Sequence, residues 1–182
     1  MALHPVDRII LLTGAASAAL FGWTYVGFRQ PLSALLPNVA LPDLAIGDHA
    51  RESVAAFFRA LAGQPDATAL FHNMLTGPEL YLPLVLAVFL FLLLLRVSNG
   101  AQMFNRPVGG PMKAIVLVQP LTYVLADYAE NAVFFGMLDQ PEPPAWMLDL
   151  SPWLTAFKFI GLSLSAIFVL RFTVLRKLQP KT

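Results

Sequence analysis

Four long apolar stretches, separated by shorter polar segments and one long loop, dominate the pattern of this chain. Their approximate bounds are residues 9–28, 80–97, 112–138 and 153–174. About 20 residues of α-helix cross a hydrocarbon core of ~30 Å, because each residue advances the helix by about 1.5 Å. The pattern therefore predicts an all-α fold, an integral membrane four-helix bundle that forms one membrane domain over residues 1–182.

The first apolar stretch resembles a cleaved signal peptide in one respect, since Ala16-Ser17-Ala18 matches the small-x-small cleavage pattern. The apolar run before that site, residues 9–12, is shorter than the usual h-region of about 7–15 residues. We therefore predict an uncleaved signal-anchor helix. Its small residues, with Gly14 and Ala18 four apart, predict close helix contact, either inside the bundle or between two copies.

The long connection, residues 29–78, is predicted to be extracytoplasmic and to contain short helices. An amphipathic helix is indicated by apolar residues at helical spacing, namely Val54, Phe57, Phe58 and Leu61. Asp48 is a candidate cap for its start and Gly63 for its end. A second short helix is predicted from Asp66 to Leu75. These helices would lie on the membrane surface or cap the bundle, or form a lid or docking platform over the polar stripe described next.

The third stretch carries polar residues in an otherwise apolar run. Asp127, Glu130 and Asn131 have the spacing i, i+3, i+4, which places them on one face of a helix. Earlier turns of that face add Tyr123 and Gln119. Carboxylates at bilayer depth rarely face lipid, so this stripe is expected near mid-bilayer against protein, water or a ligand. Together with Lys158, these residues are the candidate ligand or proton site.

Lys158 lies six residues into the fourth stretch, at a depth similar to that of Glu130. Three arrangements are open: a buried Glu130–Lys158 ion pair, a lysine that snorkels to the outer interface, or acids that line a hydrated cavity. The tilt of helical side chains toward their own N-terminus argues against the ion pair. Because Asp127 and Glu130 are a turn apart, we expect at least one proton to be shared or retained between them.

The distribution of basic residues predicts the orientation in the membrane. Lys and Arg gather in the segments that share a side with both termini, and those segments decide topology. Eight lie on that side (Arg8, Arg96, Arg106, Lys113, Arg171, Arg176, Lys177 and Lys181), against three on the other (Arg29, Arg51 and Arg59). We therefore predict a multi-pass protein of the cell membrane, inner or plasma, with both termini cytoplasmic.

Composition narrows the chemistry. The chain has no cysteine, which excludes disulfides, thiolate metal sites and iron–sulfur clusters. All three histidines lie outside the apolar stretches, so a haem held by two intramembrane histidines is excluded. A metal site is not predicted, since the spacing of Asp43, Asp48, His49 and His72 matches no ligand signature. No cofactor motif is present, and a net charge of +1 without a basic run gives no indication of nucleic acid.

These observations favour an accessory or interaction subunit that acts with another membrane protein. The first alternative is a proton-linked carrier or small-ligand or lipid-binding protein that uses Asp127 and Glu130, as a homodimer. The second alternative is a membrane enzyme with Glu130 as general acid or base, which requires a solvent-accessible pocket reaching Glu130. The layout resembles tetraspan proteins such as claudins in topology alone, because the aromatic and cysteine pattern of a claudin's first outer loop is not present.

Overall fold

The computed structural model describes residues 4–103, 106–138, 140 and 142–178, and these residues are almost entirely helical. Lys181 lies outside the described residues. In chain order the elements are α1 (Pro5–Thr24), the π-helical turn η1 (Tyr25–Arg29), α2 (Gln30–Leu35), the 3₁₀ turn η2 (Pro42–Leu44), α3 (Ala50–Ala62), α4 (Pro65–Thr76), α5 (Pro78–Ser98), β1 (Gln102–Met103), β2 (Arg106–Pro107), α6 (Gly110–Leu138) and α7 (Ala145–Leu178). The two short strands pair antiparallel, with Gln102 opposite Pro107.

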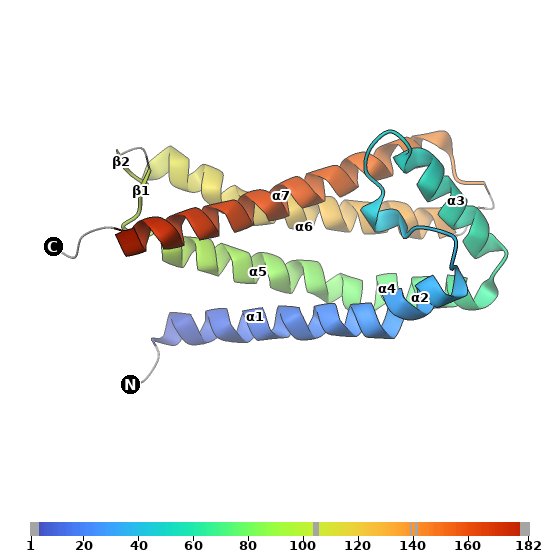
Figure 1. The fold of residues 1–182 in the computed structure, drawn as a ribbon, viewed down its shortest axis with the longest axis horizontal. Coiled ribbons are helices and arrows are strands. Elements are labelled where there is room, and N and C mark those ends of the chain that lie inside the picture. The colour runs from blue at the N-terminus through green and yellow to red at the C-terminus, as the bar shows by residue number, and fades with distance from the viewer. Residues whose placement is uncertain (1–3, 104–105, 139, 141, 179–182) are drawn as a thin grey trace.

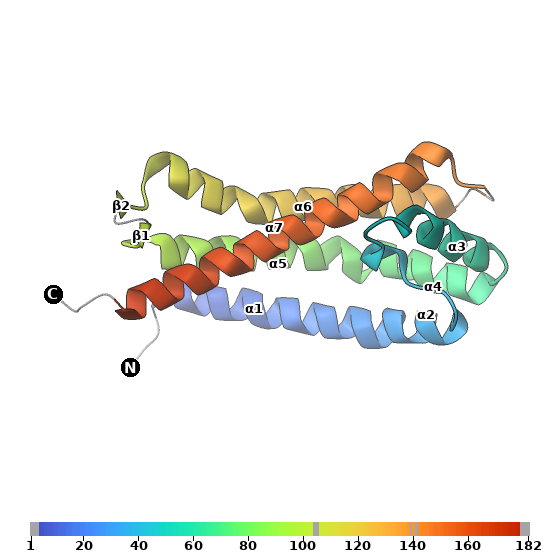
Figure 2. The same cartoon turned by 45° about the horizontal axis from the view of Figure 1, so that its top comes forward.

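Helices α1, α5, α6 and α7 lie side by side along the long axis of the molecule (Figures 1 and 2). Helix α6 packs on both α5 and α7, and α1 packs on α5. The start of α1, the end of α7 and the β1–β2 pair lie at one end. Helices α2, α3 and α4 gather at the opposite end, and we call residues 30–76 the cap.

The chain has the helices of a membrane protein. Three helical stretches are long and apolar enough to cross a membrane: Pro5–Leu35, Pro65–Ser98 and Ala145–Leu175. Large apolar side chains on these stretches face outward, among them Leu12, Val26, Leu84 and Leu170. Helix α6 covers the third predicted stretch and is not among these three.

Helix α7 begins at Ala145, earlier than the apolar pattern predicts, because its first two turns pack on the cap. Met147 and Leu148 lie against the hydrophobic core of the cap. The backbone N–H of Met147 donates to the carbonyl of Pro144 at 3.0 Å, so the helical turn starts directly after the prolines. The helix therefore extends beyond the apolar stretch 153–174 at its N-terminal end, because contacts distant in sequence add these turns.

The cap has a hydrophobic core of its own. The four apolar residues of the predicted amphipathic pattern, Val54, Phe57, Phe58 and Leu61, are all buried on α3. Phe57 and Phe58 contact Phe71 of α4, with ring centroids 5.0 and 6.0 Å apart, and Phe58 also contacts Phe134 of α6. This core fixes the cap onto the outer ends of α6 and α7.

The capping residues of helix α3 follow the sequence prediction at its C-terminal end only. Gly63 is the C-cap, as predicted. The N-cap is His49, without a side-chain hydrogen bond, so the prediction that Asp48 caps this helix is wrong. Helix α4 continues almost directly into α5 through Gly77, and the two lie end to end in Figure 1.

Two glycines permit close helix contact. A Cβ atom on Gly161 of α7 would lie 2.8 Å from the backbone nitrogen of Tyr123 and 3.0 Å from the carbonyl oxygen of Gln119 on α6. A Cβ atom on Gly14 of α1 would lie 2.9 Å from the ring of Phe89 on α5. Gly14 therefore packs inside the bundle, which is one of the two alternatives that its small-residue pattern leaves open.

The π-helical turn η1 changes the direction in which the end of α1 faces. Ile10, Ser17 and Thr24 are buried at seven-residue spacing. Arg29 is five residues beyond Thr24 and would lie about 140° away around an ordinary α-helix, at about 100° per residue. The backbone N–H of Gln30 instead donates to the carbonyl of Tyr25, an i→i+5 bond that widens the turn. The wider turn places Arg29 closer to the side of the helix on which Ile10, Ser17 and Thr24 are buried.

Candidate functional site

The candidate site begins at the contact between α6 and α7. Lys158 forms an ion pair with Glu130, and its Nζ lies 3.4 Å from Oδ1 of Asp127. The hydroxyl of Thr155 donates to the other carboxylate oxygen of Glu130. The side-chain amide of Asn131 donates to Asp127 at 3.3 Å. Glu130 has no exposed surface and Asp127 only 5%.

The structure thus contains the Glu130–Lys158 pair, one of the three arrangements that the sequence leaves open. The tilt argument against this pair is wrong for this contact. Gly161 allows α6 and α7 to approach closely, and the four-carbon stem of lysine spans the remaining offset.

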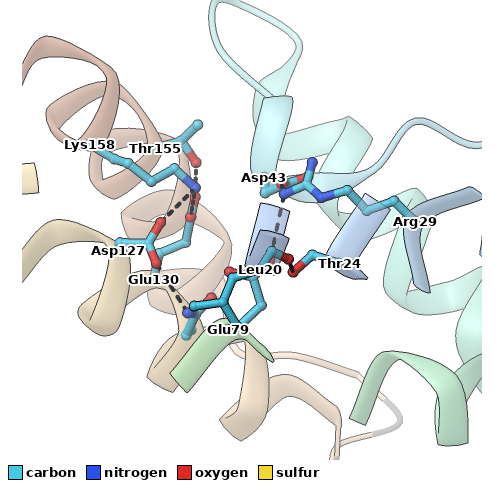
Figure 3. A network of polar contacts seen from close by, with 10 residues as sticks. Leu20, Thr24, Arg29, Asp43, Glu79, Asp127, Glu130, Thr155 and Lys158 are labelled. Carbon is cyan, nitrogen blue, oxygen red and sulfur yellow. Dashed lines mark hydrogen bonds and ion pairs between the residues drawn. The ribbon is translucent and has the colours of Figure 1, made fainter. Parts of the chain in front are cut away.

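A second group of charges faces the first from the cap side of α1 and α5. Arg29 forms an ion pair with Asp43 of η2, and its Nη2 lies 3.7 Å from Oε1 of Glu79 in the first turn of α5. Figure 3 shows Arg29 and Asp43 on one side and Lys158, Asp127 and Glu130 on the other. The two groups are joined by a shared cavity, and we call these six charged residues, with Thr155 and Asn131, the polar cluster.

The cavity inside the polar cluster is very small. Its volume is about 10 Å³, and it is lined by Arg29, Asp43, Glu79, Asn131 and Lys158 on the polar side. The apolar side of its wall comes from α4 and α6 (Phe71, Met74, Leu75 and Phe134). This volume accommodates at most about one water molecule. The polar cluster therefore encloses almost no free space beneath the cap, and at its edge the side chains of Arg29 and Asp43 remain 22% and 14% exposed.

Two buried polar atoms of residues that line this cavity lack a hydrogen bond. Within the described part of the chain, Oε1 of Glu79 and Nε of Arg29 are buried without a hydrogen bond. Glu79 itself is 7% exposed. A buried acceptor and a buried donor on one small cavity are the partners that a single bridging water requires.

The polar cluster contains an excess of acid. Four carboxyl groups, those of Asp43, Glu79, Asp127 and Glu130, face two cations, Arg29 and Lys158. Burying a charge without a partner is costly, so a largely buried site of this composition favours bound protons that bring its net charge toward zero. The arrangement can hold protons and can fix five elements to one another.

Other predicted site residues lie outside the cluster. The side-chain amide of Gln119 donates to the carbonyl of Ile115 on its own helix, at 2.9 Å. Tyr123 is buried beside Ala87 and Val124, and its hydroxyl makes no hydrogen bond among the contacts that the structure describes. Gln119 and Tyr123 thus lie along α6 away from the polar cluster, and Tyr123 contributes through packing.

Sequence reasoning misses Arg29, Asp43, Glu79 and Thr155 as members of the cluster. Arg29 has the position of a flanking base after an apolar stretch, and Glu79 that of a solvated acid in a first helical turn. Threonine in an apolar helix carries no charge signal. The one available signal is that Glu79 lies beside the apolar run of α5 at the same level as Arg29.

The residues considered for a metal site do not come together. Asp43 belongs to the polar cluster, whereas Asp48 and His49 are exposed and the ring of His72 lies 5.4 Å from that of Phe135. Among the described residues, no group of three or more His, Asp or Glu side chains is arranged to hold a metal ion.

A separate groove of about 660 Å³ lies on the outer surface of the cap. It is bordered by α3, α4 and the end of α6, with apolar side chains from Phe58, Leu61, Met137 and Leu138. The groove is not lined by any of the charged residues of the polar cluster.

No protein-family model, curated protein or solved structure matches this chain.

Proposed function

We propose that this chain is a four-span protein of the cell membrane, inner or plasma, with both termini cytoplasmic, and that it acts as an accessory or interaction subunit. The observation that carries this proposal is the polar cluster beneath the cap. A site with room for about one water molecule is better suited to holding structural elements together than to binding a ligand. The ion pairs of the polar cluster would hold the cap in one conformation, which a partner protein would bind.

The membrane placement is supported by the charges and aromatic residues of the helices. Arg8, Arg96, Lys113 and Arg171 lie near the end of the bundle opposite the cap, as the basic residues of a cytoplasmic face do. Exposed aromatic side chains surround the other end of the apolar surface: Trp23, Tyr25, Tyr81 and Trp153 are each more than half exposed. Such aromatic residues favour the membrane interface.

This placement revises the depth of the carboxylates. Seventeen residues of α-helix separate Lys113 from Glu130, and another seventeen separate Glu79 from Arg96, about 26 Å in each case. The polar cluster then lies close to the outer boundary of a ~30 Å hydrocarbon core, at the level of the aromatic belt. The sequence prediction places the acids at mid-bilayer because it takes the end of α6 to coincide with the membrane surface. The outer turns of α6 and α7 instead pack on the cap.

An interaction role is further supported by the cap itself. The cap has a hydrophobic core of its own and a groove that is lined in part by Phe58, Leu61 and Met137, each 5% exposed or less. Apolar hollows on a rigid surface are typical contact points for a partner's side chains.

The experiment is affinity purification in mild detergent at native expression, with the wild type and two variants. We expect a membrane protein to co-purify with the wild type. We expect Glu130→Gln to release that protein while Glu52→Gln, an exposed acid on α3, retains it. Recovery of this chain alone from wild-type membranes would contradict the proposal.

A second candidate, a proton-linked carrier or ligand-binding protein, is favoured by the excess of carboxyl groups in the cluster. Its test is infrared spectroscopy of the purified protein, because a protonated carboxyl group has a carbonyl stretch that a carboxylate lacks. We expect this band at neutral pH, its loss at alkaline pH, and a smaller band in Asp127→Asn with the fold intact. A spectrum without the band would contradict proton storage.

The third hypothesis, an enzyme with Glu130 as general acid or base, requires a pocket that reaches Glu130. The cavity at the cluster is lined by Lys158 and Asn131 and not by Glu130. This geometry therefore gives no support to an enzyme that uses Glu130.

A further inference from the structure

Two adjoining hollows run along the outer face of α7, beneath the loop that precedes α3. The upper hollow, about 370 Å³, lies between residues 46–51 and residues 148–156. The lower hollow, about 390 Å³, is lined by Ile46, Ala156, Phe159, Ile160, Ser163 and Leu164. Because Ile46 and Ala156 line both, the two hollows adjoin, and together we call them the α7 groove.

The chemistry of the α7 groove changes along its length. Its upper part has three charged side chains, Asp48, Arg51 and Asp149, and Nη1 of Arg51 lies 2.7 Å from Oδ1 of Asp149. Both members of this pair are about half exposed, at 50% and 54% of their side chains. In the lower part, Ser163 is the one polar side chain among the six that line it.

The α7 groove crosses the level of the aromatic belt. Trp153, which is 67% exposed, borders the upper hollow. Ser163 and Leu164 lie about ten residues further along α7, or roughly 15 Å nearer the cytoplasmic end. In the membrane placement proposed above, on which this inference rests, the charged part is in the headgroup region and the apolar part in the outer leaflet.

The loop above the groove also needs an apolar neighbour. Leu44 and Ile46 are 59% and 54% exposed, although they belong to a cap that buries most of its other large apolar residues. An acyl chain lying in the lower hollow would cover Ile46 and remove apolar surface from water, which is favourable.

We propose that the α7 groove binds one phospholipid with a zwitterionic headgroup that carries a primary amine. Arg51 would contact the phosphate, and the ammonium group would donate hydrogen bonds to Asp48 and Asp149. The acyl chain would lie along Phe159, Ile160 and Leu164.

The charges of the groove select this headgroup over two others. Two carboxylates beside one arginine disfavour an anionic headgroup that has no cation of its own. A quaternary ammonium has no N–H to donate to the carboxylates, whereas a primary ammonium has three. The exposed Arg51–Asp149 pair is weak, so a lipid can exchange with it at little cost.

The experiment uses the full chain in vesicles, with Trp23→Phe and Trp146→Phe so that Trp153 is the one remaining tryptophan. Phosphatidylcholine vesicles would contain a small fraction of a lipid with brominated acyl chains, which quench nearby tryptophan. The brominated lipid would carry an ethanolamine, a choline or a glycerol headgroup. We expect the ethanolamine lipid to quench at several-fold lower mole fraction than the other two.

Matched variants locate the preference in the groove. We expect Arg51→Gln and Asp149→Asn to remove the headgroup preference, and Arg59→Gln, an exposed arginine on the same helix, to keep it. We expect Ala156→Phe, which fills the waist of the groove, to weaken quenching by all three lipids without lowering the unfolding temperature.

Equal quenching by the three headgroups, or stronger quenching by the glycerol lipid, would overturn the proposal. If no lipid quenches Trp153, the membrane placement itself is wrong. These outcomes are distinct from a failed co-purification, which tests the partner and not the groove.

Discussion

At the scale of single residues, Lys158 is the side chain on which the polar cluster depends most. It is 8% exposed and contacts both Glu130 and Asp127, which have no other cation within ion-pair distance in the described part of the chain. Removing one member of a buried pair leaves a charge without compensation. The lysine therefore contributes more to the stability of the fold than a single cation in an otherwise apolar stretch indicates.

We expect Lys158→Met to lower the free energy of unfolding by about 3–5 kcal/mol, the cost of breaking a buried ion pair. Denaturant unfolding in detergent micelles measures this change. The double variant Lys158→Met with Glu130→Gln should regain part of the loss, because one of the two carboxylates left without a cation is then gone. Lys113→Met serves as the control, since Lys113 makes a surface hydrogen bond with Asn99. Equal stability of the two lysine variants would contradict this role.

The sequence predicts one half of the cluster because its acids interrupt an apolar run. Asp127, Glu130 and Asn131 stand out for that reason, and their spacing puts them on one face. Arg29 and Glu79 are as important to the small cavity, but a charge at the end of an apolar helix is usually solvated. The cap, whose residues are distant in sequence, covers them, so that Glu79 is buried and the side chain of Arg29 is only 22% exposed.

At the scale of the elements, the contact between α6 and α7 depends on one glycine. Any side chain at Gly161 must displace the backbone of α6 at Tyr123, since the approach of 2.8 Å is shorter than Cβ contacts allow. Small residues at such crossings let two helices approach closely. This contact sets the register in which Lys158 meets Glu130.

We expect Gly161→Leu to separate α6 from α7 and to destabilise the protein by about 1–3 kcal/mol, as overpacking does. Thermal unfolding in micelles measures the effect. Gly22→Leu is the matched control, because a Cβ atom on Gly22 of α1 has no neighbour within 4 Å. If the two variants unfold at the same temperature, α6 and α7 do not depend on this close approach.

The apolar stretches predict the existence of the long helices well, because helix length and hydropathy are local properties. They predict the ends less well. The start of α7 at Ala145 depends on Met147 and Leu148 packing on the cap, and this contact is not visible in the helix's own sequence. The same holds for the N-cap of α3, where the neighbouring His49 takes the place expected for Asp48.

At the scale of the whole molecule, the cap and the bundle of long helices form two layers that meet at the polar cluster and bury their apolar side chains to different extents. The cap is held together by aromatic and aliphatic side chains away from water, whereas the long helices expose large apolar side chains along most of their length. The two layers depend on each other, because residues of α6 and α7 form part of the hydrophobic core of the cap.

The absence of cysteine makes the orientation directly testable. We expect a single cysteine at Asp66 of the cap to react with a membrane-impermeant maleimide in intact cells. A cysteine at Gln102, in the β1–β2 pair, should react only after the membrane is opened. Both positions are exposed, so a reversed labelling pattern would show that the positive charges do not set the orientation as proposed.

The π-helical turn makes the molecule sensitive to chain length at one place. Inserting one alanine after Gly27 would place Arg29 six residues beyond Thr24, and because the π-helical turn absorbs only one extra residue, Arg29 would rotate away from Asp43, so we expect a loss of stability similar to that of Arg29→Gln. Gly27→Ala keeps the number of residues and should have little effect, because its Cβ atom meets only the movable ring of Trp23. Unfolding measurements on the three variants separate these outcomes, and equal stability of the insertion variant and the wild type would contradict the account. One residue more at this point therefore decides whether Arg29 connects the first helix to the cap, while the identity of the residue at position 27 matters little.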